Sequence, residues 1–301
     1  MQIGIDLGGS HIAVSVLSSK NTIIAKREKD ILNFEQILDM KLYIIDNIKV
    51  LISQVLKDVG APSCVISKIG IAAPGKIKNN IIYNMYNLGI EEFNLGEILS
   101  EYYGVEVNIR NDAKCAALAE KKIGNLQEYD DCVFLCIGTG IGGATFINGR
   151  MLEYTKEWGS EYGHMIIRKD GVECNCGNKG CFERYASMKV FKRRFIELLN
   201  LTENISSEDI LKFLITKVKA GDEQVNVYID EYIENVLVGI SNIINILQPE
   251  AICIGGSFAY FEKILYTRLI EKINLKDYNG IVPKIVLAKL GNDAGMIGSL
   301  L

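Results

Sequence analysis

The hydrophobic pattern changes from strand-like to helical near the start of the chain. Segments with strand-like patterns of apolar residues at 2–7, 12–17 and 22–27 are separated by short polar turns, which predicts an antiparallel meander of three strands. From residue 34 to about residue 59, apolar side chains instead recur every three or four positions, which predicts a long amphipathic helix. The chain therefore opens with strands and continues with a helix.

Strands and helices then alternate to the end of the chain. Further strands are expected at residues 65–72, 105–109, 132–137, 144–147, 251–254 and 284–288. Further helices are expected at residues 95–102, 113–122, 188–199, 222–247, 258–273 and 293–301. A strand, a glycine turn and a second strand occur at the start of the chain and again at residues 132–147. This repeat indicates a duplicated αβ architecture.

Composition and charge exclude several classes of protein. The chain has 301 residues, enough for two domains, and 49% of them are hydrophobic, as in a compact globular protein. Its 33 basic and 37 acidic residues are interspersed, so we expect no nucleic-acid partner, which would need clustered cations. We expect no leader peptide and no membrane span, because apolar windows such as residues 132–137 are short. A cytoplasmic protein with eight reduced cysteines is the expectation.

The first glycine turn follows a carboxylate. Asp6 lies near the end of the first predicted strand, and Gly8, Gly9 and Ser10 form the turn after it. Backbone N–H groups without side chains can approach phosphate oxygens, the Ser10 hydroxyl adds a donor, and Asp6 could hold a hydrated Mg²⁺ ion. A plain hairpin turn is the alternative, because Gly-Gly is a favoured two-residue connection.

Two further glycine loops follow apolar strands. One consists of Gly138, Thr139, Gly140, Ile141, Gly142 and Gly143. Its spacing fits the dinucleotide fingerprint of Rossmann oxidoreductases, but that fingerprint needs a following helix, whereas residues 144–147 favour a strand. A hairpin that binds phosphate is the better interpretation. Gly255, Gly256 and Ser257 form the other loop, where adenine and ribose could lie against the backbone; no P-loop sequence occurs.

A cluster of cysteines with one histidine is the most specific pattern in the chain. His164, Cys174, Cys176 and Cys181 lie within 18 residues and match the complete ligand set of a structural zinc site. Closed coordination indicates stabilisation rather than metal catalysis. A loop with free cysteines is the alternative, and the other histidine, His11, is interpreted as structural.

Three carboxylates form a second pattern. Asp112 follows Asn111 at a predicted helix start, where a plain N-cap is the simplest interpretation. Glu161 and Glu183, however, flank the cysteine cluster. Carboxylates and an amide that converge on one small polar molecule are suited to hold the hydroxyl groups of a sugar.

Taken together, these motifs resemble those of the ROK family of bacterial sugar kinases, repressors and open reading frames. In chain order they are DLGGS (6–10), APG (73–75), NDA (111–113), GTGIGG (138–143), EYGH (161–164), CNCGNKGCFE (174–183), GGS (255–257) and GNDAG (291–295). The resemblance implies an α/β protein with the actin-like ATPase (ribonuclease-H-like) fold, in which two αβ domains surround a cleft. Residues 1–115 would form the first domain, with the helix at 290–301 returning to it, and residues 116–289 would form the second.

The resemblance also implies an activity, a glucokinase-like transfer of the γ-phosphate of ATP to a hexose 6-hydroxyl. Asp112 would be the catalytic base, and the sugar would contact Gly75, Asn111, Asp112, Glu161, His164 and Glu183. ATP would bind at Gly8, Gly9, Ser10, Gly138, Thr139, Gly140, Gly142, Gly255, Gly256 and Ser257, with Asp6 placing Mg²⁺. A structural Zn²⁺ ion would bind His164, Cys174, Cys176 and Cys181. A homodimer is the expected assembly.

Some residues depart from the common pattern of the family. Ser160 and Tyr162 replace smaller or aliphatic residues beside Glu161, and contacts near residues 79–89 would also select the sugar. Glucose, N-acetylglucosamine, N-acetylmannosamine, fructose, allose and β-glucosides therefore all remain candidates. A sugar-responsive repressor is disfavoured, because only five residues precede Asp6 where a helix-turn-helix would be needed.

Overall fold

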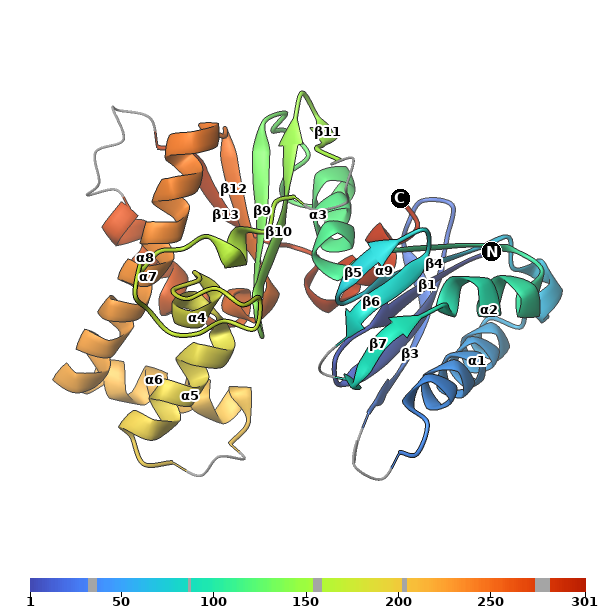
Figure 1. The fold of residues 1–301 in the computed structure, drawn as a ribbon, viewed down its shortest axis with the longest axis horizontal. Helices are drawn as coiled ribbons and strands as arrows, with labels where there is room; N and C mark the ends of the chain where they lie inside the picture. Colours follow the sequence, from blue (N-terminus) through green and yellow to red (C-terminus); the bar gives the residue numbers. More distant parts are fainter. Residues whose placement is uncertain (32–36, 86–87, 154–158, 202–204, 274–281) are drawn as a thin grey trace. The chain divides into compact units, whose positions relative to one another are not determined.

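The computed structural model describes residues 1–301 except 32–36, 86–87, 154–158, 202–204 and 274–281 (Figure 1). The chain divides into two compact units. Unit 1 contains Met1–Gly124 and Asn292–Leu301, and unit 2 contains Asn125–Leu152 and residues 159–291. The boundary expected at residues 115/116 falls inside a helix, α3 (Asp112–Ile123), which belongs to unit 1 over its whole length.

A five-stranded sheet forms the centre of unit 1. Its strands lie in the order β3 (Ile23–Asp30), β2 (His11–Leu17), β1 (Gln2–Leu7), β4 (Lys68–Ala73) and β8 (Glu106–Asn111). The first three strands form the predicted antiparallel meander, and β1, β4 and β8 are parallel. Ile3, Ile5 and Ile71 are fully buried in this sheet, because branched side chains suit a strand that is covered on its faces.

The first helix of unit 1 begins later than expected. Helix α1 (Met40–Asp58) begins at Met40, where the Asp39 side chain accepts a hydrogen bond from the Leu42 N–H. Residues 37–39 are not helical, and the first residues of the expected helix, 34–36, lie outside the described part of the chain. Helix α2 (Leu95–Tyr103) ends at Gly104, which has a φ of +67°.

A small second sheet includes part of the stretch, residues 79–89, that is expected to help select the sugar. It contains β5 (Lys76–Lys78), β6 (Ile81–Met85) and β7 (Ile90–Phe93), all antiparallel. The expected sugar contacts near residues 79–89 therefore fall partly on strand β6.

Unit 2 repeats the sheet order of unit 1. Its strands are β11 (Arg150–Met151), β10 (Ile141–Ile147), β9 (Cys132–Ile137), β12 (Ala251–Gly255) and β13 (Lys284–Leu287). As in unit 1, an antiparallel hairpin lies beside parallel strands. The strand after the glycine turn, β10, is the feature that excludes a Rossmann fingerprint, which needs a helix there.

Several helices complete the described part of unit 2. They are α4 (Glu183–Ala186), α5 (Met188–Leu198), α6 (Ser207–Lys219), α7 (Glu223–Leu247) and α8 (Leu265–Ile273). Helix α6 was not expected, and the helix expected at 258–273 is a 3₁₀ turn, η5 (Gly256–Phe261), followed by α8. Among the described residues, no helix is both long and apolar enough to cross a bilayer.

Candidate functional site

The turn after β1 places a carboxylate, two glycines and a histidine together in unit 1. Asp6 lies near the end of β1, and the Gly8 N–H donates to the His11 carbonyl oxygen at 2.9 Å. A Cβ atom on Gly8 would lie 2.4 Å from Cε1 of His11, so the close approach of the imidazole requires glycine. His11 Nε2 lies 3.4 Å from Oδ2 of Asp6, and this contact raises the pKa of His11. Gly9 and exposed Ser10 complete the turn.

A second group lies where β8 ends and α3 begins. Asn111 is the N-cap of α3, because its Oδ1 accepts hydrogen bonds from the N–H groups of Ala113 and Lys114 at 3.1 and 3.3 Å. Its Nδ2 donates to the Gly75 carbonyl oxygen at 3.3 Å, which ties the loop after β4 to the start of the helix. The capping role therefore belongs to Asn111, and Asp112 is the first residue of the helix itself.

The carboxyl group of Asp112 has an unusual acidity. The loss of solvation raises the pKa of Asp112 to about 6, although the residue itself is exposed. A hydrogen bond from the Ala113 N–H to Oδ1, at 2.8 Å, opposes this rise, whereas the nearby charge of Asp6 adds to it. Asp112 can therefore take up and release a proton near neutral pH.

The C-terminal helix α9 (Ala294–Gly298) packs against this region of unit 1. It follows a 3₁₀ turn, η6 (Gly291–Asp293), and contacts β1, β2, β4 and α3. A Cβ atom on Gly295 would lie 3.1 Å from Oδ1 of Asp6, and one on Gly298 would lie 1.7 Å from the Cys115 carbonyl oxygen. Both glycines thus allow the helix to approach Asp6 and α3 closely.

The two glycine turns of unit 2 lie at neighbouring strand ends. The Gly138 N–H donates to the Gly140 carbonyl oxygen at 2.9 Å, and Thr139 between them is exposed. The loop predicted at residues 138–143 is shorter in the structure, because β10 begins at Ile141 and Gly142 lies within it, opposite Cys136. Because β12 runs parallel to β9, the turn after β12 comes to the same edge. There Gly256 has a φ of +72°, and a Cβ atom on it would lie 2.7 Å from the Ile137 carbonyl oxygen, with Ser257 next in the chain.

Glu183 lies beside the first of these turns. A Cβ atom on Gly140 would lie 2.8 Å from Oε2 of Glu183. Phe182, the residue before Glu183, fixes the chain at this point, because its ring is fully buried against Gly239 of α7. The structure thus brings one expected nucleotide-binding residue and one expected sugar-binding residue together.

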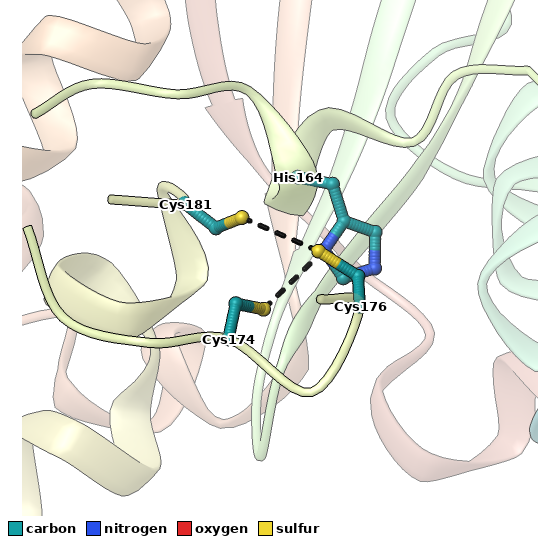
Figure 2. A group of neighbouring side chains, drawn as sticks. All are labelled: His164, Cys174, Cys176 and Cys181. Carbon is teal, nitrogen blue, oxygen red and sulfur yellow. Dashed lines mark hydrogen bonds between the residues drawn. The ribbon is translucent and has the colours of Figure 1, made fainter. Parts of the chain in front are cut away.

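The expected metal ligands converge in unit 2 (Figure 2). One ring nitrogen of His164 and the sulfur atoms of Cys174, Cys176 and Cys181 all lie within 4.8 Å of one another. Cys176 Sγ is 3.5 Å from Cys181 Sγ, and His164 Nδ1 is 3.7 Å from Cys174 Sγ. In a tetrahedral site with Zn–S bonds of about 2.3 Å and a Zn–N bond of about 2.0 Å, ligand atoms are roughly 3.5–3.8 Å apart. These two distances match such a site, whereas other pairs of the four atoms lie up to 4.8 Å apart. Three thiols and one imidazole are the ligand chemistry that a zinc ion prefers.

The cluster is connected to Glu183. Cys174 Sγ lies 3.3 Å from Oε1 of Glu183, and His164 Nδ1 lies 3.9 Å from the same oxygen. The backbone N–H of Asn178 lowers the pKa of the Cys176 thiol, as suits a thiolate ligand, whereas burial raises the pKa of Cys181 to about 12. A bound cation would stabilise the thiolate form of all three cysteines.

Glu161 lies at the start of the 3₁₀ turn η4 (Tyr162–His164). Its side chain is exposed, and its carbonyl oxygen accepts a hydrogen bond from the His164 N–H at 3.0 Å. Gly163 between them packs against β10, where a Cβ atom would lie 2.2 Å from the Ile141 carbonyl oxygen. This close packing explains the glycine of the Glu-Tyr-Gly-His motif.

The expected site residues thus form one group in each unit. Asp6, Gly8, Gly75, Asn111 and Asp112 belong to unit 1, whereas the other two glycine turns, Glu161, Glu183 and the metal ligands belong to unit 2. Sequence reasoning missed the contact of His11 with Asp6, although the position of His11 just after the glycine turn was a usable signal.

Comparisons with known proteins agree on one family. Residues 2–301 of this chain match the ROK family. A glucokinase from Thermotoga maritima is 30% identical over 315 aligned positions, which cover 99% of this chain and 95% of that protein. A xylose repressor from Caldicellulosiruptor bescii is 27% identical over 99% of this chain and 76% of the repressor.

A solved structure has the same fold. The crystal structure of a ROK family glucokinase from Streptomyces griseus, in complex with glucose and AMPPNP, superposes with a TM-score of 0.81 at 22% identity. The match covers 99% of this chain and 97% of that one. The expected fold, that of the actin-like ATPases, is thereby confirmed.

Proposed function

The chain belongs to the ROK family, and from this premise we propose that it is an ATP-dependent sugar kinase that phosphorylates a hexose, with Asp112 as its general base. The observation that carries the proposal is the position and acidity of Asp112, the first residue of α3, with a pKa raised to about 6. A general base works best when its pKa lies near the working pH. The named function of the glucokinase relatives supports the same reaction.

The proposed reaction is a displacement at the γ-phosphorus of ATP. Asp112 takes the proton of the attacking sugar hydroxyl as the sugar oxygen bonds to the γ-phosphorus. The bond from that phosphorus to the β,γ-bridging oxygen breaks, and ADP leaves with the electron pair. Asp112 is a neutral carboxylic acid after the step, so it later returns its proton to solvent.

The remaining residues would bind and orient the substrates. The turns at Gly8 and Gly138 offer backbone N–H groups to phosphate oxygens, and Gly256 lets a nucleotide lie close to the backbone. Asp6 supplies a carboxylate oxygen, a ligand type suited to magnesium, which neutralises phosphate charge when bound. Asn111 would contact the sugar while it continues to cap α3.

In unit 2, Glu161 and Glu183 are proposed to accept hydrogen bonds from sugar hydroxyls, and His164 would contribute its Nε2 atom. Because His164 Nδ1 faces the cysteine cluster, only the other ring nitrogen remains for the sugar. Zinc held by the cluster would fix this histidine and keep Cys174 in place beside Glu183.

The substrate that we favour is a glucose-like hexose phosphorylated at its 6-hydroxyl. N-acetylmannosamine, N-acetylglucosamine, fructose, allose and β-glucosides are the alternatives. A coupled assay of ADP release over this panel, with the purified protein, ATP and Mg²⁺, tests the proposal directly. Turnover with at least one sugar is the expected result.

A sugar-responsive regulator is a second candidate, because the xylose repressor matches over 99% of this chain. This candidate predicts sugar binding, detected by calorimetry, without any sugar-dependent release of ADP. A protein that binds sugar but turns over none of the panel would favour it over the kinase.

A further inference from the structure

Three hydroxyl groups meet beneath the segment that carries Glu161. Thr145 Oγ1, on β10, lies 2.8 Å from Ser160 Oγ and 2.5 Å from the hydroxyl oxygen of Tyr162. Thr145 is only 2% exposed and Tyr162 only 8%. Since a threonine hydroxyl has one donor and two acceptor positions, it can donate to one of these partners and accept from the other. The three side chains form the hydroxyl cluster.

The cluster includes the residues on both sides of Glu161, Ser160 and Tyr162. The Tyr162 N–H donates to the Ser160 carbonyl oxygen at 2.8 Å, and Glu161 between them has φ −77° and ψ 57°. These are the angles of an inverse γ-turn with Glu161 at its tip. Ser160 itself has a φ of +57°, a conformation uncommon for residues other than glycine, so side-chain bonds help to hold it.

The ring of Tyr162 adds a packing contact to these bonds. A Cβ atom on Gly143 would lie 2.9 Å from Cδ2 of this ring, so the ring lies directly on β10. Glu161 is thus fixed on its N-terminal side by β10 and on its C-terminal side by the hydrogen bond to the His164 N–H. His164, a member of the cysteine cluster, takes part only in the second of these contacts.

We propose that the hydroxyl cluster of Thr145, Ser160 and Tyr162 is a positioning device that aims the Glu161 carboxylate at a sugar hydroxyl, and so sets affinity for the sugar. The inference rests on the proposed function, because it takes Glu161 as a sugar ligand. None of the three residues needs to touch the sugar. A purely structural role is a different hypothesis, because a valine and a phenylalanine would fill the same buried space.

The test is a double variant, Thr145→Val with Tyr162→Phe, which removes both hydroxyls of the buried bond. The Ser160 hydroxyl loses its bond to Thr145, but Ser160 is only half-buried, so water can replace that partner. Removing both partners of a buried hydrogen bond is close to neutral for stability, so the melting temperature should stay within about 3 °C. We expect KM for the sugar to rise about tenfold, while KM for ATP and kcat change less than about twofold. Tyr266→Phe removes another tyrosine hydroxyl of unit 2, bonded to the Ile285 carbonyl oxygen, and is the matched control.

A mutant cycle that combines the double variant with Glu161→Gln shows whether the hydroxyl cluster acts through Glu161. In a Glu161→Gln background, the double variant should raise KM for the sugar no further than about twofold, because coupled residues are not additive. Sugar affinity is also measured by calorimetry, so that binding is determined apart from turnover.

The outcomes separate the two proposals. Turnover by the unmodified protein with an unchanged sugar KM in the double variant would overturn the positioning role and leave the kinase function standing. If the double variant raised the sugar KM by the same factor in the Glu161→Gln background as in the unmodified protein, the positioning role would also be overturned. Absence of both sugar turnover and sugar binding in the unmodified protein would overturn the proposed function together with this inference.

Discussion

Oε2 of Glu183 lies 2.8 Å from the point that a Cβ atom would occupy on Gly140. The turn between β9 and β10 therefore lies directly beside Glu183, the first residue of α4. Since the turn is proposed to bind phosphate and Glu183 to bind sugar, this contact would couple the two substrates.

Gly140→Ala tests that contact. The flexible end of Glu183 can move away, so we expect a melting temperature within about 3 °C of the unmodified protein. The displaced carboxylate should raise KM for the sugar about fivefold or more. Gly138→Ala is the matched variant, because no atom lies within 4 Å of its Cβ position. It should leave KM for the sugar unchanged, whatever its effect on ATP; equal sugar KM values in the two variants would contradict the account.

The acidity of Asp112 predicts the pH dependence of the reaction. A base is active when deprotonated, so kcat should be constant above the pKa and fall about tenfold per pH unit below about 6. The measurement is kcat at saturating ATP and sugar from pH 5 to pH 8. A flat profile down to pH 5 would argue against Asp112 as the base.

The same pKa makes a prediction about stability. The pKa of Asp112 is higher in the folded protein than the ordinary value of 3.8, so folding favours the protonated carboxyl. Stability is therefore lost as the pH rises from about 4 to about 6. Asp112→Asn should raise the melting temperature at pH 8 and have little effect at pH 4; a lower melting temperature at pH 8 would contradict this.

Metal removal should affect both stability and sugar binding. We expect about one zinc per chain by elemental analysis, and fewer in Cys176→Ser. The variant should melt at a lower temperature and bind sugar more weakly, because His164 and Glu183 lose their support. Cys136→Ser changes a half-buried cysteine outside the cluster and should keep its zinc. A metal-free unmodified protein with full sugar affinity would refute the structural role.

Packing behind Glu183 gives a prediction that does not depend on the chemistry. A Cβ atom on Gly239 would lie 2.3 Å from Cζ of the buried ring of Phe182. Because that ring is rigid and enclosed, Gly239→Ala should reduce the free energy of unfolding by about 1–3 kcal/mol. Denaturant unfolding measures the change, and an unaltered midpoint would contradict the described packing.

Much of this architecture is predictable because it depends on local patterns. The glycine turns, the strands β1, β9 and β12 and the spacing of the metal ligands all follow from neighbouring residues. The early start predicted for α1 was wrong at residues 37–39, because apolar spacing continues past the Asp39 cap that begins the helix.

Other features depend on contacts between distant segments. Strand β5, with exposed Lys76 and Lys78, has too little apolar character to be recognised alone, and it forms by pairing with β6. The hydroxyl cluster joins Thr145 to a segment fifteen residues away, so no spacing rule reveals it. The Asn111 cap likewise became distinguishable from an Asp112 cap only through its hydrogen bonds.

Asp112→Asn provides the most direct test of the proposed base. The measurement is the rate of sugar phosphate formation at pH 7.5, with saturating ATP and sugar, beside sugar and ATP binding by calorimetry. Loss of general-base catalysis should lower the rate by about 10²–10⁴-fold, while both dissociation constants stay within about fivefold of those of the unmodified protein. A rate within about threefold of the unmodified protein, with binding intact, would contradict the assignment of Asp112 as the base.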